Sequence, residues 1–470
     1  MNDFATATAR DWIDPFCPLL SDRIGVLPGD PPRPGEPAAR RTAQALASFT
    51  AASVENLPQA WIDDQPASLD DAVAQAARLL AECHQPLFGG LGTDVAGARE
   101  LTRLGLRCGA ILDHAHGDGM MQALRALQDR GGFSCTLSEV RSRADLIVCI
   151  GIDPGHSSPD FFARCGIGEA VGGGPGEGPN EGPSEGPSEG PDEGPGDAPD
   201  QRVVVFLRGS GASGASDGEA WLQGRGGVTV EVMDFGDADL HVLIAELNAA
   251  CLQRPLPRAG PHWAALQALA NRLLAARYAV LVYAPGELPG RHAALLVEAI
   301  SRVAKTLNRT SRAGSLAIGS ADGSVAANQV ATWLTGLPLR TALHAHRLDH
   351  DPHRHGARRL LAAGAVDGLL WVSSFTPDLV PPAAAVAGDR ALPLVVLGHP
   401  AMVSALRREG GELRGRRVFI PVSTPGVNAP GQLFRSDGGI VLNLKPFMPT
   451  TLPAVADVAL RIRNRLEARP

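Results

Sequence analysis

The sequence predicts an α/β protein of at least two lobes, each built on a doubly wound, mostly parallel sheet. Short apolar runs, such as residues 146–150, alternate with segments whose apolar residues recur at helical spacing. This alternation is typical of βαβ units, which place neighbouring strands parallel. A chain of 470 residues is also too long for one hydrophobic core, so two to four domains are expected.

Each element follows from a local pattern. In the first clear helix, Leu69, Val73, Ala76, Ala77 and Leu80 fall on one side. The predicted helices are 70–81, 95–104 (with Thr93 as its N-cap), 120–128, 239–251, 262–276, 292–307 and 454–466. The predicted strands are 86–90, 109–112, 146–150, 202–207, 228–232, 279–283, 369–372, 393–397 and 417–421.

These elements divide the chain into five segments. Residues 1–65 are rich in proline and predict a small N-terminal region, and 66–170 form a first α/β lobe. An insertion at 171–201 separates this lobe from a second one at 202–375, which a C-terminal α/β region at 376–470 follows.

The insertion is an acidic Gly/Pro-rich segment. Glutamates recur in E-G-P units with a period of four, at Glu177, Glu181, Glu185, Glu189 and Glu193. Glycine and proline block helix and sheet, and the segment has nothing apolar to bury, so it predicts a disordered loop. The simplest interpretation is an insertion that a surface loop tolerates; a tethering or regulatory role is the alternative.

Composition excludes several classes of partner. The chain has a formal charge of -7, but the insertion holds eight acidic residues, so the remainder is close to neutral. A neutral body without a basic stripe argues against nucleic acid. No apolar run is long enough to span a bilayer and no signal peptide is apparent, which predicts a cytoplasmic protein without a membrane partner. The scattered cysteines, without a C-x-x-C pair, predict reduced thiols: Cys17, Cys83, Cys108, Cys135, Cys149, Cys165 and Cys251.

Two motifs at strand ends are weak candidates for chemistry. The Gly-rich turn at 89–94 follows a strand and opens a helix, which suits a phosphate site, but it lacks both the full G-x-G-x-x-G pattern and a Walker lysine. A structural βα turn is the favoured interpretation. Ser373 and Ser374 follow another strand without a G-x-S-x-G elbow, so a serine hydrolase has little support.

Two histidine-rich segments are candidate metal sites. After the strand 109–112, His114 and His116 would share one face, and Asp118 could complete a zinc site. Polar residues at a strand end are equally ordinary in α/β proteins. In the second segment, interleaved arginines oppose a cation, which predicts a solvated polar loop. Its histidines are His344, His346, His350, His353 and His355.

Two segments resemble ligand-binding segments of the B subunits of formylmethanofuran dehydrogenases, a family related to the molybdopterin oxidoreductases. That family opens with a C-P-x-C-x-x-x-C-type motif that binds a four-iron cluster; here Cys17 matches the middle cysteine, while Asp14 and Ser21 take the places of the others. The family's molybdenum- or tungsten-ligating cysteine, or selenocysteine, falls in the loop after the strand 109–112. That loop contains Asp113, His114, His116 and Asp118, but no cysteine.

Later segments extend the resemblance over nearly the whole chain outside the insertion. Asn328-Gln329 with Thr332-Trp333-Leu334-Thr335-Gly336 resembles the family's N-Q-x-x-x-W-x-T-G segment. Pro425-Gly426, Arg435-Ser436-Asp437-Gly438 and Leu444-Lys445 resemble its C-terminal P-G…R-x-D-G…L-K region. The resemblance therefore implies a multi-lobed, molybdopterin-oxidoreductase-like fold.

Loss of both ligand sets is similar to what is found in the B subunits of the bacterial formyltransferase/hydrolase complexes of methylotrophs. The resemblance implies a non-catalytic scaffold without catalytic residues, cofactor or metal. Its implied partners are a hydrolase subunit, a formyltransferase subunit, a further structural subunit and a methanofuran-like carrier. Such a complex moves a formyl group from formyl-tetrahydromethanopterin to the carrier and releases formate, in formaldehyde oxidation. That route needs no redox step.

Two alternatives stay open at this point. The chain could be an active molybdenum or tungsten formylmethanofuran dehydrogenase subunit in which Asp113 or Asp118 ligates the metal. It could instead be a zinc hydrolase that uses His114 and His116.

Overall fold

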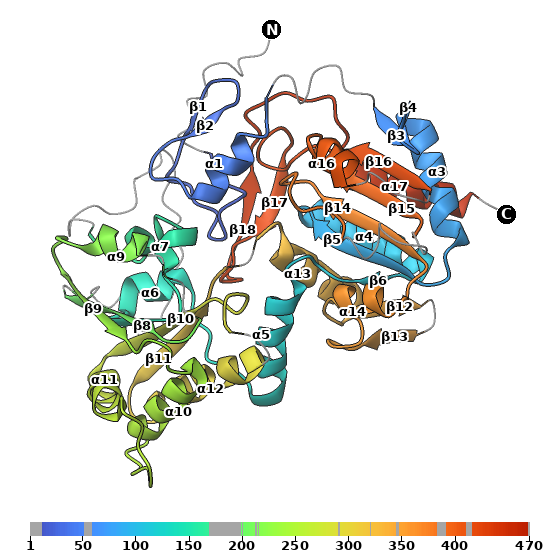
Figure 1. The fold of residues 1–470 in the computed structure, drawn as a ribbon. Helices are drawn as coiled ribbons and strands as arrows, with labels where there is room; N and C mark the ends of the chain where they lie inside the picture. The colour runs from blue at the N-terminus through green and yellow to red at the C-terminus, as the bar shows by residue number, and fades with distance from the viewer. Residues whose placement is uncertain are drawn as a thin grey trace, which may run out of the picture. The chain divides into compact units, whose positions relative to one another are not determined.

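The computed structural model describes residues 12–50, 59–168, 199, 201–211, 214, 216–289, 292–319, 321–344, 347–382, 392–409 and 416–468. The chain forms two compact units (Figure 1): unit 1 comprises Met1–Arg125 and Gly319–Pro470, and unit 2 comprises Ala126–Ile318. This division differs from the five segments above because β14 (Gly368–Ser373), which follows unit 2 in the chain, pairs with β5 (Pro86–Gly92), which precedes it. The five segments remain a prediction, and most of 171–201 lies outside the described residues.

Within the described residues, unit 1 is built on a nine-stranded mixed sheet. Its central strands, from β6 to β16, are parallel, while antiparallel pairs close both ends. In sheet order the strands are β13 (Arg347–His350), β12 (Thr341–His344), β6 (Ile111–Leu112), β5 (Pro86–Gly92), β14 (Gly368–Ser373), β15 (Leu394–Gly398), β16 (Arg417–Pro421), β3 (Ala60–Ile62) and β4 (Gln65–Ala67).

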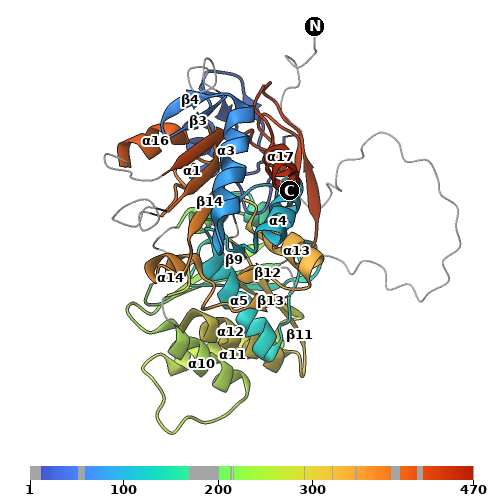
Figure 2. The same cartoon turned by 90° about the vertical axis from the view of Figure 1, so that its right-hand side faces the viewer.

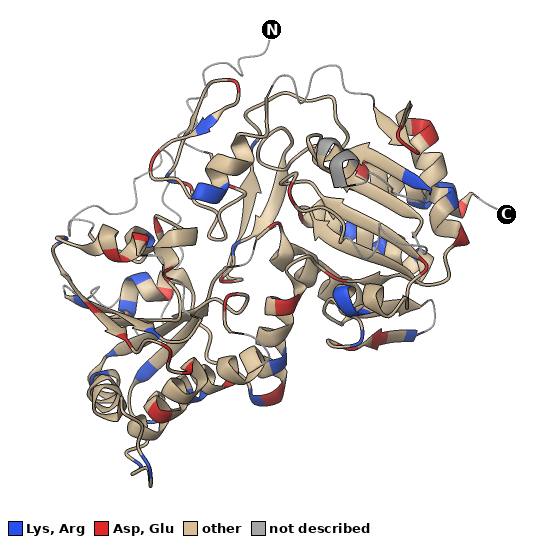
Figure 3. Ribbon diagram, viewed as in Figure 1, with Lys and Arg blue, Asp and Glu red and all other residues tan. Residues whose placement is uncertain are grey.

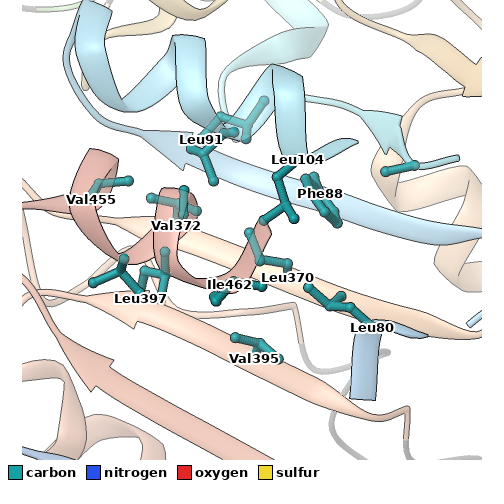
Figure 4. Close-up of a cluster of buried hydrophobic side chains, with 14 of the residues drawn as sticks. Leu80, Phe88, Leu91, Leu104, Leu370, Val372, Val395, Leu397, Val455 and Ile462 are labelled. Atoms are coloured by element: carbon teal, nitrogen blue, oxygen red, sulfur yellow. The ribbon is translucent and has the colours of Figure 1, made fainter. Parts of the chain in front are cut away.

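Helices cover both faces of this sheet. Alternate residues of β14 show the division: Leu370 points to one apolar cluster and Leu369 to another. Figure 4 shows the first cluster, in which Phe88, Leu370 and Ile462 meet. The helices on that side, side by side in Figure 2, are α3 (Leu69–Glu82), α4 (Val95–Cys108) and α17 (Val455–Glu467). On the other side are α14 (Ala357–Ala362) and α16 (Met402–Glu409).

Unit 2 is built on a five-stranded parallel sheet in its described residues. Its order is β11 (Arg312–Ala317), β10 (Tyr278–Tyr283), β7 (Leu146–Ile150), β8 (Arg202–Arg208) and β9 (Val228–Asp234). The helices of this unit are α6 (Leu137–Arg143), α7 (Pro154–Ser157), α8 (Phe161–Arg164), α9 (Asp217–Leu222), α10 (Leu240–Cys251), α11 (Trp263–Ala275) and α12 (Ala293–Leu307). The α/β class with parallel sheets is thus confirmed.

The other helices and strands of the described residues lie outside these two sheets and the helices named above. They are β1 (Val26–Leu27), β2 (Arg33–Pro34), α1 (Arg40–Leu46), α5 (Gly117–Arg130), α13 (Ser324–Thr335), β17 (Gly431–Phe434) and β18 (Val441–Leu444). The prediction that Thr93 caps α4 is wrong, because Asp94 is the N-cap and its side chain accepts the N–H of Gly97 at 2.9 Å. Among the described residues, no helix has the length and apolarity needed to cross a membrane.

Candidate functional site

Polar side chains gather where the parallel strands of unit 1 end. Asp113 and His114 follow β6, Asp94 follows β5, Ser374 follows β14 and His399 follows β15, and all five are buried. The chain leaves β5 through α4 toward β6 but leaves β14 toward β15, so it turns to opposite sides at this pair. Open α/β sheets place ligands at such a switch point, which makes this edge the candidate site.

Arg340 binds Asp113 in the loop that follows β6 and Asp118 in the first turn of α5. Its Nε donates to Asp113 Oδ1 at 3.1 Å, and another guanidinium nitrogen donates to Asp118. The second oxygen of Asp113 accepts the N–H of Ala357 at 2.7 Å. Burial opposes the charge of Arg340, but Asp113 and Asp118 outweigh it and raise the pKa of the guanidinium. The loop is therefore fixed by a buried ion pair.

His114 is a buried neutral imidazole in the same loop. Its Nδ1 accepts the backbone N–H of His116 at 3.0 Å, so its Nε2 carries the proton and donates to the carbonyl oxygen of Asp322 at 3.1 Å. Complete burial lowers the pKa of His114 to about 4, with the neighbouring His116 as a second cause. Both ring nitrogens are engaged in these hydrogen bonds.

Asp322 is the buried anion of the site. His116 Nε2 lies 2.9 Å from one of its carboxylate oxygens, and Arg41 lies 2.5 Å from the other. Burial alone would raise the pKa of Asp322, but the hydrogen bond from His116 and the charge of Arg41 hold it well below its usual value. Asp322 and Gly323 have φ of +53° and +72°, and a Cβ on Gly323 would lie 2.0 Å from the carbonyl oxygen of Thr93. Only glycine fits this close approach.

Helix α1 connects this anion to the altered N-terminal motif. Its neighbouring residues Arg41 and Thr42 bind different carboxylates, since Thr42 Oγ1 donates to Asp14 Oδ2 at 2.5 Å. Asp14 Oδ1 accepts the N–H of Phe16 at 2.9 Å, and the N–H of Asp14 donates to the carbonyl of Ser21 at 2.8 Å. The loop from Asp14 to Ser21 is thus closed by its own hydrogen bonds and by α1.

The residues of this motif do not fit a four-iron cluster. Such a cluster is held by four soft thiolates, whereas the motif offers Cys17 alone. At the flanking positions, Asp14 is a fully buried carboxylate that accepts two hydrogen bonds, and Ser21 is a buried hydroxyl.

The loop after β6 is no better suited to a pterin-bound metal or to zinc. Asp113 is neutralised by Arg340, and the carboxylate of Asp118 is held by the same guanidinium. His114 has no lone pair to offer, because Nδ1 accepts one hydrogen bond and Nε2 donates another. In the part of the chain that the structure describes, no three His, Cys, Asp or Glu side chains converge as a metal site would require. The side chains present therefore do not fit the zinc site of that hypothesis.

The Gly-rich turn has a structural explanation. Gly89 and Gly90 lie inside β5, where an added Cβ would come within 3.0 Å of the Trp371 ring and 2.4 Å of the Val372 carbonyl oxygen, respectively. The glycines thus allow close approach of β5 to β14 at a point where their register shifts. Ser374 is fully buried and donates to the carbonyl of Gly92 at 2.8 Å, which is a packing role rather than that of a nucleophile.

The predicted solvated loop at the histidine cluster is wrong in part. Its first half forms the β12–β13 hairpin, paired from Thr341–His350 to His344–Arg347. His350 and His355 turn inward, and the Nδ1 atom of each lies 3.2 Å from the carbonyl oxygen of Arg340. His344 and His353 are exposed, and His346 lies outside the described residues. These two histidines therefore contact the backbone of Arg340 and help to fix its position.

Four residues of the site lie outside the motifs identified in the sequence: Arg41, Thr42, Asp322 and Arg340. They lie far along the chain from the motifs that they bind, and Arg340 reaches Asp113 across 227 residues. The Asp322-Gly323 pair was the available signal, because Asp-Gly marks a turn that can adopt positive φ. The buried arginine had no local sequence signal.

Comparison with known proteins identifies the fold. The chain is 29% identical over 411 residues to the B subunit of the formyltransferase/hydrolase complex Fhc of Methylorubrum extorquens, spanning 87% of this chain and 98% of that protein. Among solved structures, it matches a chain of the Methylorubrum extorquens formyltransferase/hydrolase complex FhcABCD bound to methylofuran, with a TM-score of 0.65, 26% identity and the same coverage. The predicted resemblance is confirmed. This chain is a relative of the Fhc B subunit.

This chain is also similar to the B subunit of a dehydrogenase. It is 24% identical over 443 residues to the B subunit of the tungsten-containing formylmethanofuran dehydrogenase 2 of Methanocaldococcus jannaschii, with 91% of each chain covered. No protein-family model matches the chain. Internal hydrogen bonds and ion pairs occupy the two segments to which the resemblance assigned the ligands.

Proposed function

We propose that the chain is a non-catalytic scaffold subunit of a formyltransferase/hydrolase complex. In this proposal, the complex transfers the formyl group of formyl-tetrahydromethanopterin to a methanofuran-type carrier and hydrolyses it to formate, in one-carbon metabolism. Its partners are the hydrolase, the formyltransferase and a further structural subunit. The observation that carries the proposal is the match over 98% of the Fhc B subunit in both sequence and fold.

The geometry of the site supports a non-catalytic role for this chain. A catalytic carboxylate or imidazole needs an accessible atom with hydrogen-bonding capacity left for a substrate. Asp113 and Asp322 are buried and paired with guanidinium groups, and both nitrogens of His114 are engaged. Hydrolysis and transfer of a formyl group involve no net oxidation, so such a complex can function without the pterin-bound metal and the cluster.

Cytoplasmic localisation belongs to the same proposal. Cys149 and Cys165 are buried thiols, and burial raises the pKa of Cys165 to about 12. Neutral thiols of this kind suit a reducing compartment.

Purification of the native complex by a tag on this chain tests the proposal. Hydrolase and formyltransferase subunits should co-purify in fixed stoichiometry, and elemental analysis should find molybdenum, tungsten and iron only in substoichiometric amounts. Stoichiometric tungsten or molybdenum together with an extractable pterin would establish the dehydrogenase alternative instead. Purification of the chain without either enzyme subunit would refute the proposed function.

A further inference from the structure

Unit 2 has the strand order of a dinucleotide-binding domain. Across the sheet its strands are β9, β8, β7, β10 and β11, all parallel, which is the order 3-2-1-4-5 when they are numbered along the chain. Sheets of this order bind a dinucleotide beyond the carboxyl ends of the strands, at the point where the order reverses. Here the reversal falls between β7 and β10, so the turn after β7 is where this fold would hold phosphates.

The turn after β7 departs from the glycine pattern that such phosphate binding uses. In G-x-G-x-x-G, the first glycine makes the tight turn and the second lets the backbone approach the phosphates. Gly151, with a φ of +69°, takes the first position, but Asp153 and His156 take the second and the third. The helix that follows, α7, has only four residues, whereas a dinucleotide-binding domain continues here into a long helix.

The carboxylate of Asp153 binds backbone groups that a phosphate at this turn would need. Its Oδ1 accepts the N–H of Gly155 at 2.9 Å, and its Oδ2 accepts the N–H of Gly218 at 2.8 Å and that of Glu219 at 3.4 Å. These donors come from the segments that follow β7 and β8, and Asp153 is only 5% exposed. Backbone N–H groups that converge on one anion are typical of phosphate loops, and here the anion belongs to the chain.

The two segments that supply these donors also touch each other. A Cβ on Gly155 would lie 2.4 Å from the Cα of Gly218, and a Cβ on Gly218 would lie 2.2 Å from Asp153 Oδ1. A phosphate group is much larger than a methyl group. It therefore cannot share this space with the Asp153 carboxylate.

The charges around this turn also oppose a phosphate. Asp217 and Glu219 lie in the first turn of α9 (Figure 3). Two nearby basic side chains are already bound to these carboxylates, since His156 Nδ1 lies 2.7 Å from Asp217 and Arg208 donates to Glu219 at 2.7 Å. Burial raises the pKa of Asp153, and the backbone N–H groups oppose that rise because they bind the ionised carboxylate.

We infer that the carboxylate of Asp153 takes the place of the dinucleotide phosphate in unit 2, so that this domain binds no nucleotide at the turn after β7. The inference does not rest on the proposed function, because it concerns unit 2 alone and none of the proposed partners enters the argument.

Phosphate binding to the full-length chain tests the inference. Asp153→Gly removes the internal anion and frees its backbone donors. Asp217→Asn removes a neighbouring charge, on a side chain that is 66% exposed, and is the matched control. Isothermal titration calorimetry with inorganic phosphate, and separately with ADP, should show binding to Asp153→Gly that is about tenfold tighter, or more, than to the wild type or the control. That factor corresponds to one hydrogen bond to a charged group.

Asp153→Ser is a second variant for the case in which the glycine variant does not fold. Serine frees most of the space and can still cap one backbone N–H group. Its melting temperature, followed by circular dichroism, should be higher in phosphate than in chloride at the same ionic strength, whereas that of the wild type should be the same in both salts.

Three results would overturn the inference. A wild-type chain that binds phosphate or ADP as tightly as Asp153→Gly would show that the turn is open. Equal gains in Asp153→Gly and Asp217→Asn would show a general effect of charge rather than occupation of the donors. Variants of Asp153 that gain no phosphate binding, or that stay unfolded in phosphate as in chloride, would show that the carboxylate does not occupy a phosphate position.

Discussion

The two segments of unit 1 to which the resemblance assigned metal ligands are held in different ways. The loop from Asp14 to Ser21 is held by hydrogen bonds within itself, by Thr42 and by the N–H of Ser436, which donates to the carbonyl of Pro18 at 3.0 Å. The loop after β6 is instead fixed by buried charges, with Asp113 bound to Arg340 and His116 bound to Asp322. The carboxylate of Asp14 is bound by Thr42, 28 positions away, whereas Arg340 binds Asp113 across 227 positions and His116 binds Asp322 across 206. The loop after β6 should therefore be the more sensitive to substitution and to pH.

The largest effect is expected for Arg340→Ala. This change leaves Asp113, whose side chain is 2% exposed and whose pKa burial already raises, as a buried carboxyl without the cation that favours its charge. The free energy of unfolding should fall by about 3–5 kcal/mol, measured by urea denaturation of the isolated chain. Arg354→Ala, at an exposed arginine of the neighbouring hairpin, is the control and should leave the denaturation midpoint unchanged. Equal midpoints for the two variants would show that the ion pair does not hold this loop.

His114 should make the stability of the loop after β6 sensitive to acid. Burial lowers its pKa to about 4 in the folded chain, against 6.5 for an exposed histidine. Because the unfolded state then binds more protons, stability is full above pH 6.5 and falls as the pH drops from 6.5 to 4, by about 3 kcal/mol in all. His399, also buried and with a pKa lowered to about 3 by burial, acts in the same direction.

His114→Gln tests this expectation. The variant should have a shallower dependence of unfolding free energy on pH between 6.5 and 4, recorded by denaturant titration at several pH values. His353→Gln, an exposed histidine of the same unit, is the matched control and should keep the wild-type profile. If both variants keep that profile, His114 is not the source of the acid sensitivity.

Asp322→Asn should have the next largest effect. Asparagine keeps the shape of the side chain and tolerates positive φ, but the charged hydrogen bonds to His116 and Arg41 are lost. At pH 7 the variant should be less stable by about 2 kcal/mol. The pKa of Asp322 is depressed in the folded chain, so its contribution is present above the ordinary value of 3.8 and is lost as the pH falls below it. The gap between variant and wild type should therefore close in acid, and a constant gap would contradict this assignment.

The contrast between the two segments also shows what the sequence could reveal. Runs such as Leu146–Ile150 and Arg417–Pro421 coincide with β7 and β16, since a strand buried on both faces is apolar throughout. Motifs pointed to Asp14, Cys17 and Asp113, because each occupies a recognisable position after a strand or in a short pattern. They did not reveal Asp322 or Arg340. A long-range charge pair leaves no periodicity in the sequence, and β12, which leads away from Arg340, is a strand of only four residues between β13 and β6.

A smaller effect is expected at Asp14. Asp14→Asn and Thr42→Val each disturb the hydrogen bond that joins this loop to α1, at 2.5 Å. In a double-mutant cycle the coupling between the two should be about 1 kcal/mol, the net value of one such bond. If the losses of unfolding free energy in the two single variants add up to that of the double variant, the Asp14–Thr42 hydrogen bond does not stabilise the fold.

The same cycle can decide whether the two arrangements form one network. Thr42 and Arg41 are consecutive in α1 and bind Asp14 and Asp322, respectively, so a shift of this helix disturbs both carboxylates. Asp14→Asn combined with Asp322→Asn should therefore deviate from additivity by at least ~0.5 kcal/mol, whereas independent sites add within that margin. Asp14→Asn combined with Arg354→Ala is the reference pair and should be additive. If the first pair is additive as well, the two segments are stabilised independently. Helix α1 then contacts both segments without coupling their contributions to the free energy of unfolding.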